Sequence, residues 1–363
     1  MSACGADEPL DVPQVISAGG PVLAHPVVVP IFFAGDEDMQ AMVEPFLAAL
    51  PGSDYWAATT REYGIGDLRV GPTIVASEAP PTTGDELEAW LRTMLDGAHP
   101  GWPAPTADAI YTVYLPAGAT LTSSFGTSCV GFGGYHGEIA IGDTKVAYAL
   151  VARCQSSVTS DLDFATMLTS HELVEAASDP YYRTAPAYLG FDDDYAVWSV
   201  FEGVELSDLC EDDRAEVVHL GAYPVERSWS NRSMREGHSP CVPVPQRSFA
   251  RAVPDLPDHV GDVAADQVLT RGVSIPAGTS RTIEVRLHAD GATADWQVKA
   301  RDLAASVLGQ SDALSFSWDR DTGHAGDVLH LTITHLRSGT HPFSLWSVGA
   351  EVTEGTWYGM VGD

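Results

Sequence analysis

The chain has 363 residues, of which 50 are acidic and 19 basic, giving a formal net charge of −31. Such a surface repels nucleic acid and anionic membranes, because phosphate binding needs clustered Lys and Arg, so no nucleic-acid partner is expected. No stretch approaches about 18 consecutive apolar residues, so no transmembrane helix is expected either. The length suffices for one large domain or two ordinary ones.

The first residues predict a tether. Met1-Ser2-Ala3-Cys4 resembles the end of a bacterial lipoprotein signal, in which Cys4 is the lipidated residue. The alternative is a free cysteine on a frayed terminus. We expect residues 1–19, rich in Pro, Gly and acidic residues, to form the tether, with membrane contact only through a lipid anchor at Cys4. The expected location is extracytoplasmic, at a bacterial cell surface or in the periplasm, or otherwise secreted.

Strand and helix patterns then alternate. The predicted elements are a buried strand at 26–33, helices at 36–50 and 84–95, and strands at 110–115, 137–141 and 145–151. This alternation predicts an α/β (α+β) domain over residues 20–245. Residues 181–245 show no long periodic element, so we expect loops around a site there.

Period-2 alternation of apolar and polar residues dominates residues 246–363. The alternating segments are 273–275, 281–287, 296–300, 314–318, 329–334 and 343–346. Frequent Gly, Pro and Asp between them predict an all-β antiparallel sandwich of the Ig/FnIII-like kind. No cluster of catalytic residue types occurs in it, so binding or spacing is its expected role.

Four cysteines follow Cys4, namely Cys129, Cys154, Cys210 and Cys241. They allow two disulfides in three pairings, of which Cys129–Cys154 with Cys210–Cys241 joins the nearest neighbours in sequence. Disulfides imply an oxidising compartment. None of the cysteines lies in a CxxC pattern, so we do not expect them to bind metal.

The segment from Ser160 to Ser178 predicts a central helix that Ser160 caps and Asp179-Pro180 ends. His171 and Glu175 lie four residues apart and continue an apolar stripe of Phe164, Met167 and Leu168. A carboxylate on a core-facing row is costly unless it is paired or bound to a cation. The spacing therefore indicates a metal site, with a buried hydrogen-bonded His171–Glu175 pair as the alternative.

His171-Glu172-Leu173-Val174-Glu175 is the zincin motif HExxH with its second His replaced by Glu. In this interpretation His171 and Glu175 bind Zn²⁺, and Glu172, at the edge of the same face, is the catalytic general base. Asp179 extends the pattern and is predicted to orient a ligand from outside.

A third ligand must come from elsewhere. The candidates are His136, Glu205 and Asp208. Asp192-Asp193-Asp194 is expected to be a solvated loop, with an additional Ca²⁺ site as the alternative.

Several ordered motifs resemble the Exordium-like (phosphate-induced) proteins of plants and their secreted bacterial relatives. The motifs are Gly134-Tyr135-His136, Tyr148–Val151 with Cys154, His171–Pro180, Glu205–Glu211 and Trp229-Ser230-Asn231. The resemblance covers about residues 20–245. It implies a secreted protein with a zincin-like α/β core, and it places His136, His171, Glu175, Glu205 and Asp208 near one centre. Asp179 stands where the plant pattern has Asn.

The function predicted from these features is that of a zinc-dependent metallopeptidase acting on a peptide or protein, with Tyr135, Tyr223 or Arg227 as candidates to stabilise an oxyanion. One alternative is a non-catalytic surface protein that keeps a structural metal and binds a cell-wall polymer or partner through the sandwich. Another is a calcium-stabilised adhesin, which needs an all-oxygen site. A monomer is expected.

Overall fold

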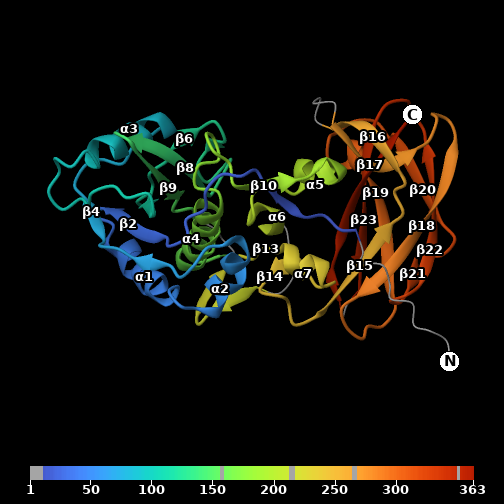
Figure 1. The fold of residues 1–363 in the computed structure, drawn as a ribbon, viewed down its shortest axis with the longest axis horizontal. Coiled ribbons are helices and arrows are strands. Elements are labelled where there is room, and N and C mark those ends of the chain that lie inside the picture. Colours follow the sequence, from blue (N-terminus) through green and yellow to red (C-terminus); the bar gives the residue numbers. More distant parts are fainter. Residues whose placement is uncertain (1–10, 156–158, 212–216, 264–267, 350–351) are drawn as a thin grey trace.

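A computed structural model describes residues 11–155, 159–211, 217–263, 268–349 and 352–363. Cys4 lies outside the described residues, and so does the lipid anchor predicted there. The chain is mostly β, and its two largest groups of strands lie at opposite ends of an elongated molecule, joined by short helices (Figure 1).

A mixed sheet forms the centre of the first group. Its strands are β2 (Val27–Phe33), β3 (Arg69–Val70), β4 (Ile74–Ala76), β5 (Ala109–Tyr114), β8 (Gly134–Ile141) and β9 (Thr144–Val151). The order is β3-β2-β5-β9-β8, with β4 also beside β2. Only β8 is antiparallel to its neighbour, and it forms an edge. The parallel strands β2, β5 and β9 are almost wholly buried, as a sheet covered on both faces requires.

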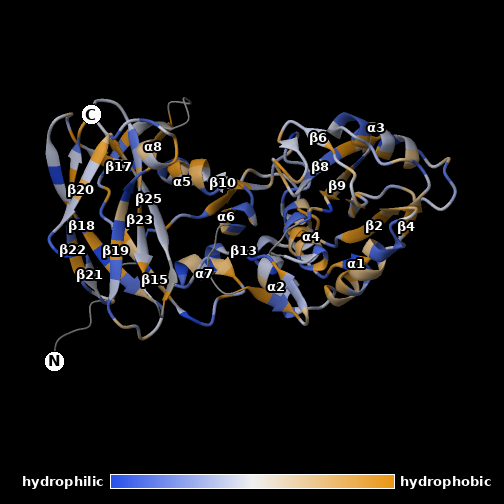
Figure 2. Ribbon diagram, turned by 180° about the vertical axis from the view of Figure 1, so that it is seen from behind, coloured by the Kyte–Doolittle hydropathy of each residue, from blue (hydrophilic) through white to orange (hydrophobic). Residues whose placement is uncertain are grey.

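Helices cover both faces of this sheet. The helices are α1 (Glu37–Ala49), α2 (Asp54–Thr60), α3 (Gly84–Met94) and α4 (Asp161–Ser178). Successive residues of β2 point to opposite faces of the sheet, and each face packs in its own hydrophobic cluster. Phe32 packs in the cluster that contains residues of α1 and α4, whereas Phe33 packs in the cluster that contains residues of α3. The predicted α/β layer is thus present, although α2 was not expected. Figure 2 shows the hydrophobic residues along β2 and β9.

Helix α4 has the predicted bounds. The Ser160 side chain accepts a hydrogen bond from the Asp163 backbone N–H, and Asp179 is the C-cap. Every residue from 169 to 178 is buried. The predicted apolar stripe is wrong in the first half of the helix, because Phe164, Met167 and Leu168 are only half-buried and Ala165, Thr166 and Thr169 take the core face instead.

Short elements fill residues 181–245, where long loops were expected. They are β10 (Tyr188–Phe191), α5 (Ala196–Phe201), α6 (Asp208–Glu211), β11 (Val218–Leu220), β12 (Tyr223–Val225), β13 (Ser228–Trp229), α7 (Asn231–Arg235) and β14 (Cys241–Val242). Strand β1 (Val15–Ser17) pairs with β10, and Val12 and Val15 are buried. The predicted tether over residues 1–19 is therefore wrong for residues 12–17, which belong to the fold because Val12 and Val15 are buried and β1 pairs with β10.

The strands from residue 248 onward form two sheets of a sandwich, whose residues alternate between hydrophobic and hydrophilic in Figure 2. One sheet has the order β20-β22-β18-β15-β24 and the other β16-β17-β25-β23-β19-β21. The strands are β15 (Ser248–Pro254), β16 (Asp258–Val263), β17 (Val268–Ser274), β18 (Ser280–Ala289), β19 (Trp296–Asp302), β20 (Leu314–Trp318), β21 (Thr322–Gly323), β22 (Val328–His335), β23 (His341–Val348), β24 (Val352–Glu354) and β25 (Thr356–Gly362).

The prediction of a purely antiparallel sandwich needs one correction. The pairs β15–β24 and β17–β25 are parallel. The last strands return beside strands far back in the sequence, so no hairpin fixes an antiparallel direction there.

Aromatic side chains join the two parts of the molecule. On α5, Trp198 makes edge contacts with Phe191 and Trp229 on one side and with Trp357 and Tyr358 of β25 on the other. These residues belong to one continuous hydrophobic cluster that extends from the mixed sheet into the sandwich. The two parts therefore share a core at α5.

Both disulfides join cysteines that are neighbours in sequence, Cys129–Cys154 and Cys210–Cys241. This is one of the three pairings that the sequence allowed. Two disulfides fit an extracytoplasmic protein, because such bonds persist in oxidising compartments. Among the described residues, no helix has the length and apolarity that a membrane span needs.

Replacing Trp198 by Ala tests the shared core. Trp198 is 4% exposed, so the Trp198→Ala variant is expected to lose about 3–5 kcal/mol of unfolding free energy. Val200 lies on the same helix but is 45% exposed, so Val200→Ala should change the unfolding free energy by less than about 0.5 kcal/mol. Urea denaturation measures both, and equal effects would show that α5 does not carry the junction.

Candidate metal centre

Six side chains from three parts of the chain converge beside α4. His171, Glu172 and Glu175 come from the helix itself, and His136 comes from the edge strand β8. Glu205 comes from the turn before α6, and Asp208 is the first residue of α6. His136 reaches the group because it pairs with Ala149, whose side of the sheet packs against α4. All five ligand candidates are thus brought together.

The first group of possible ligands surrounds the Nε2 atom of His171. This atom lies 3.2 Å from Glu175 Oε2 and 3.4 Å from Asp208 Oδ1. Two ligand atoms bound to one tetrahedral zinc ion at about 2.0–2.1 Å lie about 3.3 Å apart. The three side chains are therefore already spaced for a shared ion.

The second group contains His136. Its Nδ1 atom lies 3.7 Å from Glu175 Oε2 and 4.0 Å from Glu172 Oε2. Its Nε2 atom lies 3.2 Å from the carbonyl oxygen of Asp179 and 3.3 Å from Glu205 Oε1. His136, Glu172 and Glu175 could thus also hold an ion, and Glu175 is common to both groups.

Backbone contacts fix Glu175. Its Oε1 atom accepts hydrogen bonds from the N–H groups of Ser207, at 3.1 Å, and Asp208, at 3.0 Å. Its Oε2 atom is left to face both histidines. Burial alone would raise the pKa of Glu175, but His171 and His136 hold this pKa well below its usual range.

One residue of the centre, Glu226, was not predictable from the sequence. Its Oε2 atom lies 2.6 Å from His171 Nδ1. Glu226 is itself held by two backbone contacts, from its N–H to Ser170 Oγ and from Tyr55 Oη to its carbonyl oxygen. A carboxylate on the outer nitrogen of a histidine directs the other nitrogen toward a metal, so Glu226 turns His171 Nε2 toward Glu175 and Asp208. No spacing signals this contact, because 55 residues separate its partners.

Two glycines make room for site carboxylates. A Cβ atom on Gly134 would lie 2.6 Å from Glu172 Oε1. A Cβ atom on Gly203 would lie 2.6 Å from the Cβ atom of Asp208, and the φ angle of Gly203 is +92°. Any larger residue at either position would therefore displace a carboxylate of the centre.

The centre concentrates negative charge away from water. Burial raises the pKa of Glu172 well above its usual range and that of Glu205 to about 8. Although burial opposes it, the carboxylates around His136 raise the pKa of that imidazole to about 10, Glu205 most of all. Among the described residues, Glu172 Oε2 and Glu205 Oε1 are buried without a hydrogen-bond partner. A divalent cation would replace the protons on these carboxyl groups and bind these oxygens.

Asp179 contributes differently from the prediction. Its carboxylate accepts a hydrogen bond from the Ala187 N–H at 2.7 Å, and its backbone carbonyl, not its side chain, contacts His136. Asp179 thus orients a ligand through its backbone.

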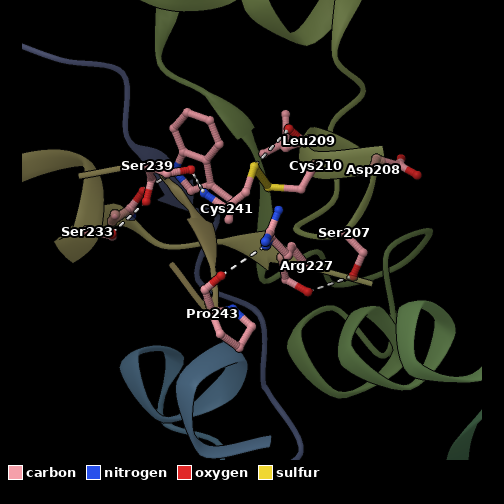
Figure 3. The surroundings of a disulfide bond; sticks show 12 residues. Ser207, Asp208, Leu209, Cys210, Arg227, Ser233, Ser239, Cys241 and Pro243 are labelled. Atoms are coloured by element: carbon pink, nitrogen blue, oxygen red, sulfur yellow. Dashed lines mark hydrogen bonds between the residues drawn. A yellow bond between two sulfur atoms is a disulfide. The ribbon is translucent and has the colours of Figure 1, made fainter. Parts of the chain in front are cut away.

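The prediction that Tyr135 lies beside the metal centre and stabilises an oxyanion is wrong. Neighbouring residues of a strand face opposite sides, so Tyr135 points away from His136 and packs with Phe132 and Tyr148 on the far face of the sheet. The other two oxyanion candidates are also engaged elsewhere. Tyr223 packs against Phe46, and Arg227 donates to the carbonyl oxygen of Pro243 (Figure 3).

The alternative of a calcium site at residues 192–194 gains no support from the contacts of Asp194. Its carboxylate pairs with His259 at 2.8 Å and with Arg271 at 2.9 Å, both in the sandwich. Asp194 therefore links the two parts of the molecule.

No family model and no curated protein matches the chain. Domains 4 and 5 of the S-layer protein SbsC match 30% of the chain with 18% identity and a TM-score of 0.19, and the chain spans 54% of that structure. A conjugative transposon lipoprotein from Bacteroides eggerthii matches 32% of the chain over 99% of its own length, with 9% identity and a TM-score of 0.21. The BIgI domain of the beta protein from S. agalactiae, bound to CEACAM1, matches 32% over 95% of its length, with 11% identity and a TM-score of 0.19. Scores this low carry no inference about function.

Changing Glu226 to Gln tests how His171 is oriented. The variant removes the negative charge of the Glu226 carboxylate that contacts His171 Nδ1. It is expected to weaken zinc binding about 10–100-fold. Competition with a fluorescent zinc chelator measures this affinity. Glu236→Gln, at an exposed position, should leave it unchanged. Unaltered affinity in Glu226→Gln would mean that the Glu226 carboxylate does not orient a zinc ligand.

The Cys210–Cys241 bridge ties α6 to β14, and Asp208 points away from it in Figure 3. Replacing both cysteines by Ser should cost about 3–4 kcal/mol of stability and should also weaken zinc binding, because Asp208 loses its support. The double Ser variant at Cys129 and Cys154 should lose similar stability but keep its zinc affinity. Denaturant titration and zinc competition together check both variants. Equal zinc affinity in the two variants would contradict the assigned role of α6.

Proposed function

We propose that the chain is an extracytoplasmic zinc-dependent hydrolase of the metallopeptidase type, in which His171, Glu175 and Asp208 bind the ion. The spacing of these three side chains carries the proposal, since their ligand atoms lie 3.2 and 3.4 Å apart around His171 Nε2. Histidine nitrogen and carboxylate oxygen are both zinc ligands. His136 and Glu205 lie beside this set and complete the shell.

Glu172 is the proposed general base. Zinc supplies a Lewis acid, which polarises a carbonyl group and lowers the pKa of a nearby water molecule. Glu172 would take the proton of that water, because its Oε2 atom is buried beside the centre without a hydrogen-bond partner among the described residues. Gly134 keeps the space in which this carboxylate lies.

The surroundings of His136 favour an extended peptide as the substrate. Among the described residues, β8 pairs with β9 on one side and is the edge of the sheet on the other. An extended peptide can add to such an edge as a further strand. A cavity of about 420 Å³, lined in part by Tyr135 and Tyr148, lies on the opposite face of this sheet from His136, and Tyr182, which also lines the cavity, contacts the His136 ring at 5.3 Å.

The proposal includes the zincin-like and Exordium-like interpretation of residues 20–245. It is supported by the convergence of the motif residues around one centre and by the packing of the HExxE helix against a sheet. We further propose that Cys4 carries a lipid anchor, that the protein lies at a bacterial cell surface, and that it acts as a monomer.

Burial favours a second candidate function, that of a non-catalytic surface protein with a structural metal. His136, Glu172 and Glu175 are 3%, 3% and 2% exposed, as in a closed site. The sandwich would then bind a cell-wall polymer or a partner protein.

Metal analysis of the purified protein, combined with a broad peptide-cleavage assay, separates the two functions. Glu172→Gln is expected to retain zinc and to lose cleavage about 10²–10⁴-fold, whereas His171→Ala should lose both. Glu236→Gln is the exposed control. Zinc binding without cleavage by the unmodified protein would favour the structural metal, and the absence of zinc would overturn both functions.

A further inference from the structure

A second hollow lies across α6 from the metal ligands, where the short helices meet the sandwich. It has a volume of about 390 Å³, within the range of small-molecule sites. Its wall is mixed polar and apolar and includes the aromatic side chains of Trp198, Trp229, Trp346 and Tyr358. Trp346 and Tyr358 line the cavity and are only half-buried.

The side chain of Arg251 lines this cavity and is 2% exposed. Its Nη1 atom contacts the sulfur of Met234 at 2.9 Å, and its Nε atom is buried without a hydrogen-bond partner. No carboxylate forms an ion pair with it among the residues that the structure describes. Buried guanidinium groups are normally paired with an anion, so this charge lacks its usual counterpart.

The charge of Arg251 persists at neutral pH. Burial lowers the pKa of its guanidinium to about 10, which still leaves the group protonated at pH 7. The charge of Asp290 raises this pKa, but the Asp290 carboxylate is already bonded to the Phe249 N–H and to His238.

A second cation stands at the exposed side of the cavity. Arg301 lies over the ring of Trp346, 5.8 Å from its centroid. The carboxylate that lines the same cavity, Glu202, accepts a hydrogen bond from the hydroxyl group of Tyr358. Two arginines thus line one small cavity in a chain that has only 19 basic residues.

We propose that this cavity binds a small organic anion that carries its carboxylate, sulfate or phosphate group on a ring. The anionic group would accept hydrogen bonds from Arg251, which supplies the missing counter-charge. The ring would pack on the Trp346 and Tyr358 side of the cavity, where both aromatic side chains are only half-buried. Arg301 would favour entry of the anion into an otherwise strongly acidic protein.

The test uses the whole protein and follows its tryptophan fluorescence, since three tryptophans line the cavity. The probes are glucuronate, benzoate and inorganic phosphate, with glucose and benzyl alcohol as neutral counterparts. Saturable binding of glucuronate or benzoate, at least tenfold tighter than the neutral counterparts, is expected. Tighter binding of glucuronate would identify a sugar acid as the ligand type, and tighter binding of benzoate an aromatic acid. No saturable binding of any anion, or binding of inorganic phosphate alone, would overturn the proposal.

Arg251→Met is the decisive variant. It preserves the apolar volume of the side chain but removes the unpaired charge, so its thermal midpoint should be no lower than that of the unmodified protein. Its affinity for the anion should fall more than tenfold. Arg286→Met, at a side chain that is 62% exposed on the sandwich, should bind normally. Unchanged affinity in Arg251→Met would overturn the proposal, as would equal loss in both variants.

The anion site does not depend on the proposed zinc chemistry. No metal ligand lines the cavity, so protein treated with a chelator should bind the anion with unchanged affinity. If chelation abolishes anion binding, the anion occupies the metal centre and the cavity assignment is wrong.

Discussion

Glu175 accepts two backbone N–H groups on one oxygen and faces two imidazoles with the other, and the rest of the centre is arranged around this carboxylate. Burying it together with Glu172 is costly in free energy, because neither reaches water. The histidines offset part of the negative charge, and protonation of Glu172 and Glu205 offsets more. A bound divalent cation would replace these protons, so the metal and the protons compete for one cluster.

Much of the fold follows from local pattern. The strand at 26–33, helix α4 with its Ser160 cap and six sandwich strands were predictable, because hydrophobic period and capping act over a few residues. The parallel pairs β15–β24 and β17–β25 were not, since only tertiary contacts bring their strands together. The same reason applies to β1, whose burial depends on β10, about 170 residues away in the chain.

The same distinction between local pattern and tertiary contact applies to the residues of the site. His171, Glu172 and Glu175 were predictable because helical spacing places them together. His136, Glu205 and Asp208 were candidates for a third ligand, and the resemblance placed them near the same centre. Tyr135 was misassigned because neighbours on a strand face opposite sides of the sheet. Glu226 was missed because a contact across 55 residues leaves no local pattern. Arg251 was invisible for a different reason: a single arginine in an alternating strand looks like a solvated residue until its burial is known.

The metal centre and the cavity lie on opposite sides of one four-residue helix, α6. Asp208 faces the centre, while the next residue, Leu209, lines the cavity, and Cys210 is bonded to Cys241 of the cavity wall. A helix this short has too few internal hydrogen bonds to hold its own position. Its place is set by the disulfide and by the contacts of Glu175 with the N–H groups of Ser207 and Asp208. A ligand in the cavity could affect the metal only by moving α6, and two sites are coupled only through states that differ in affinity for both ligands. Because the disulfide restrains that movement, the two sites are expected to bind independently despite their proximity.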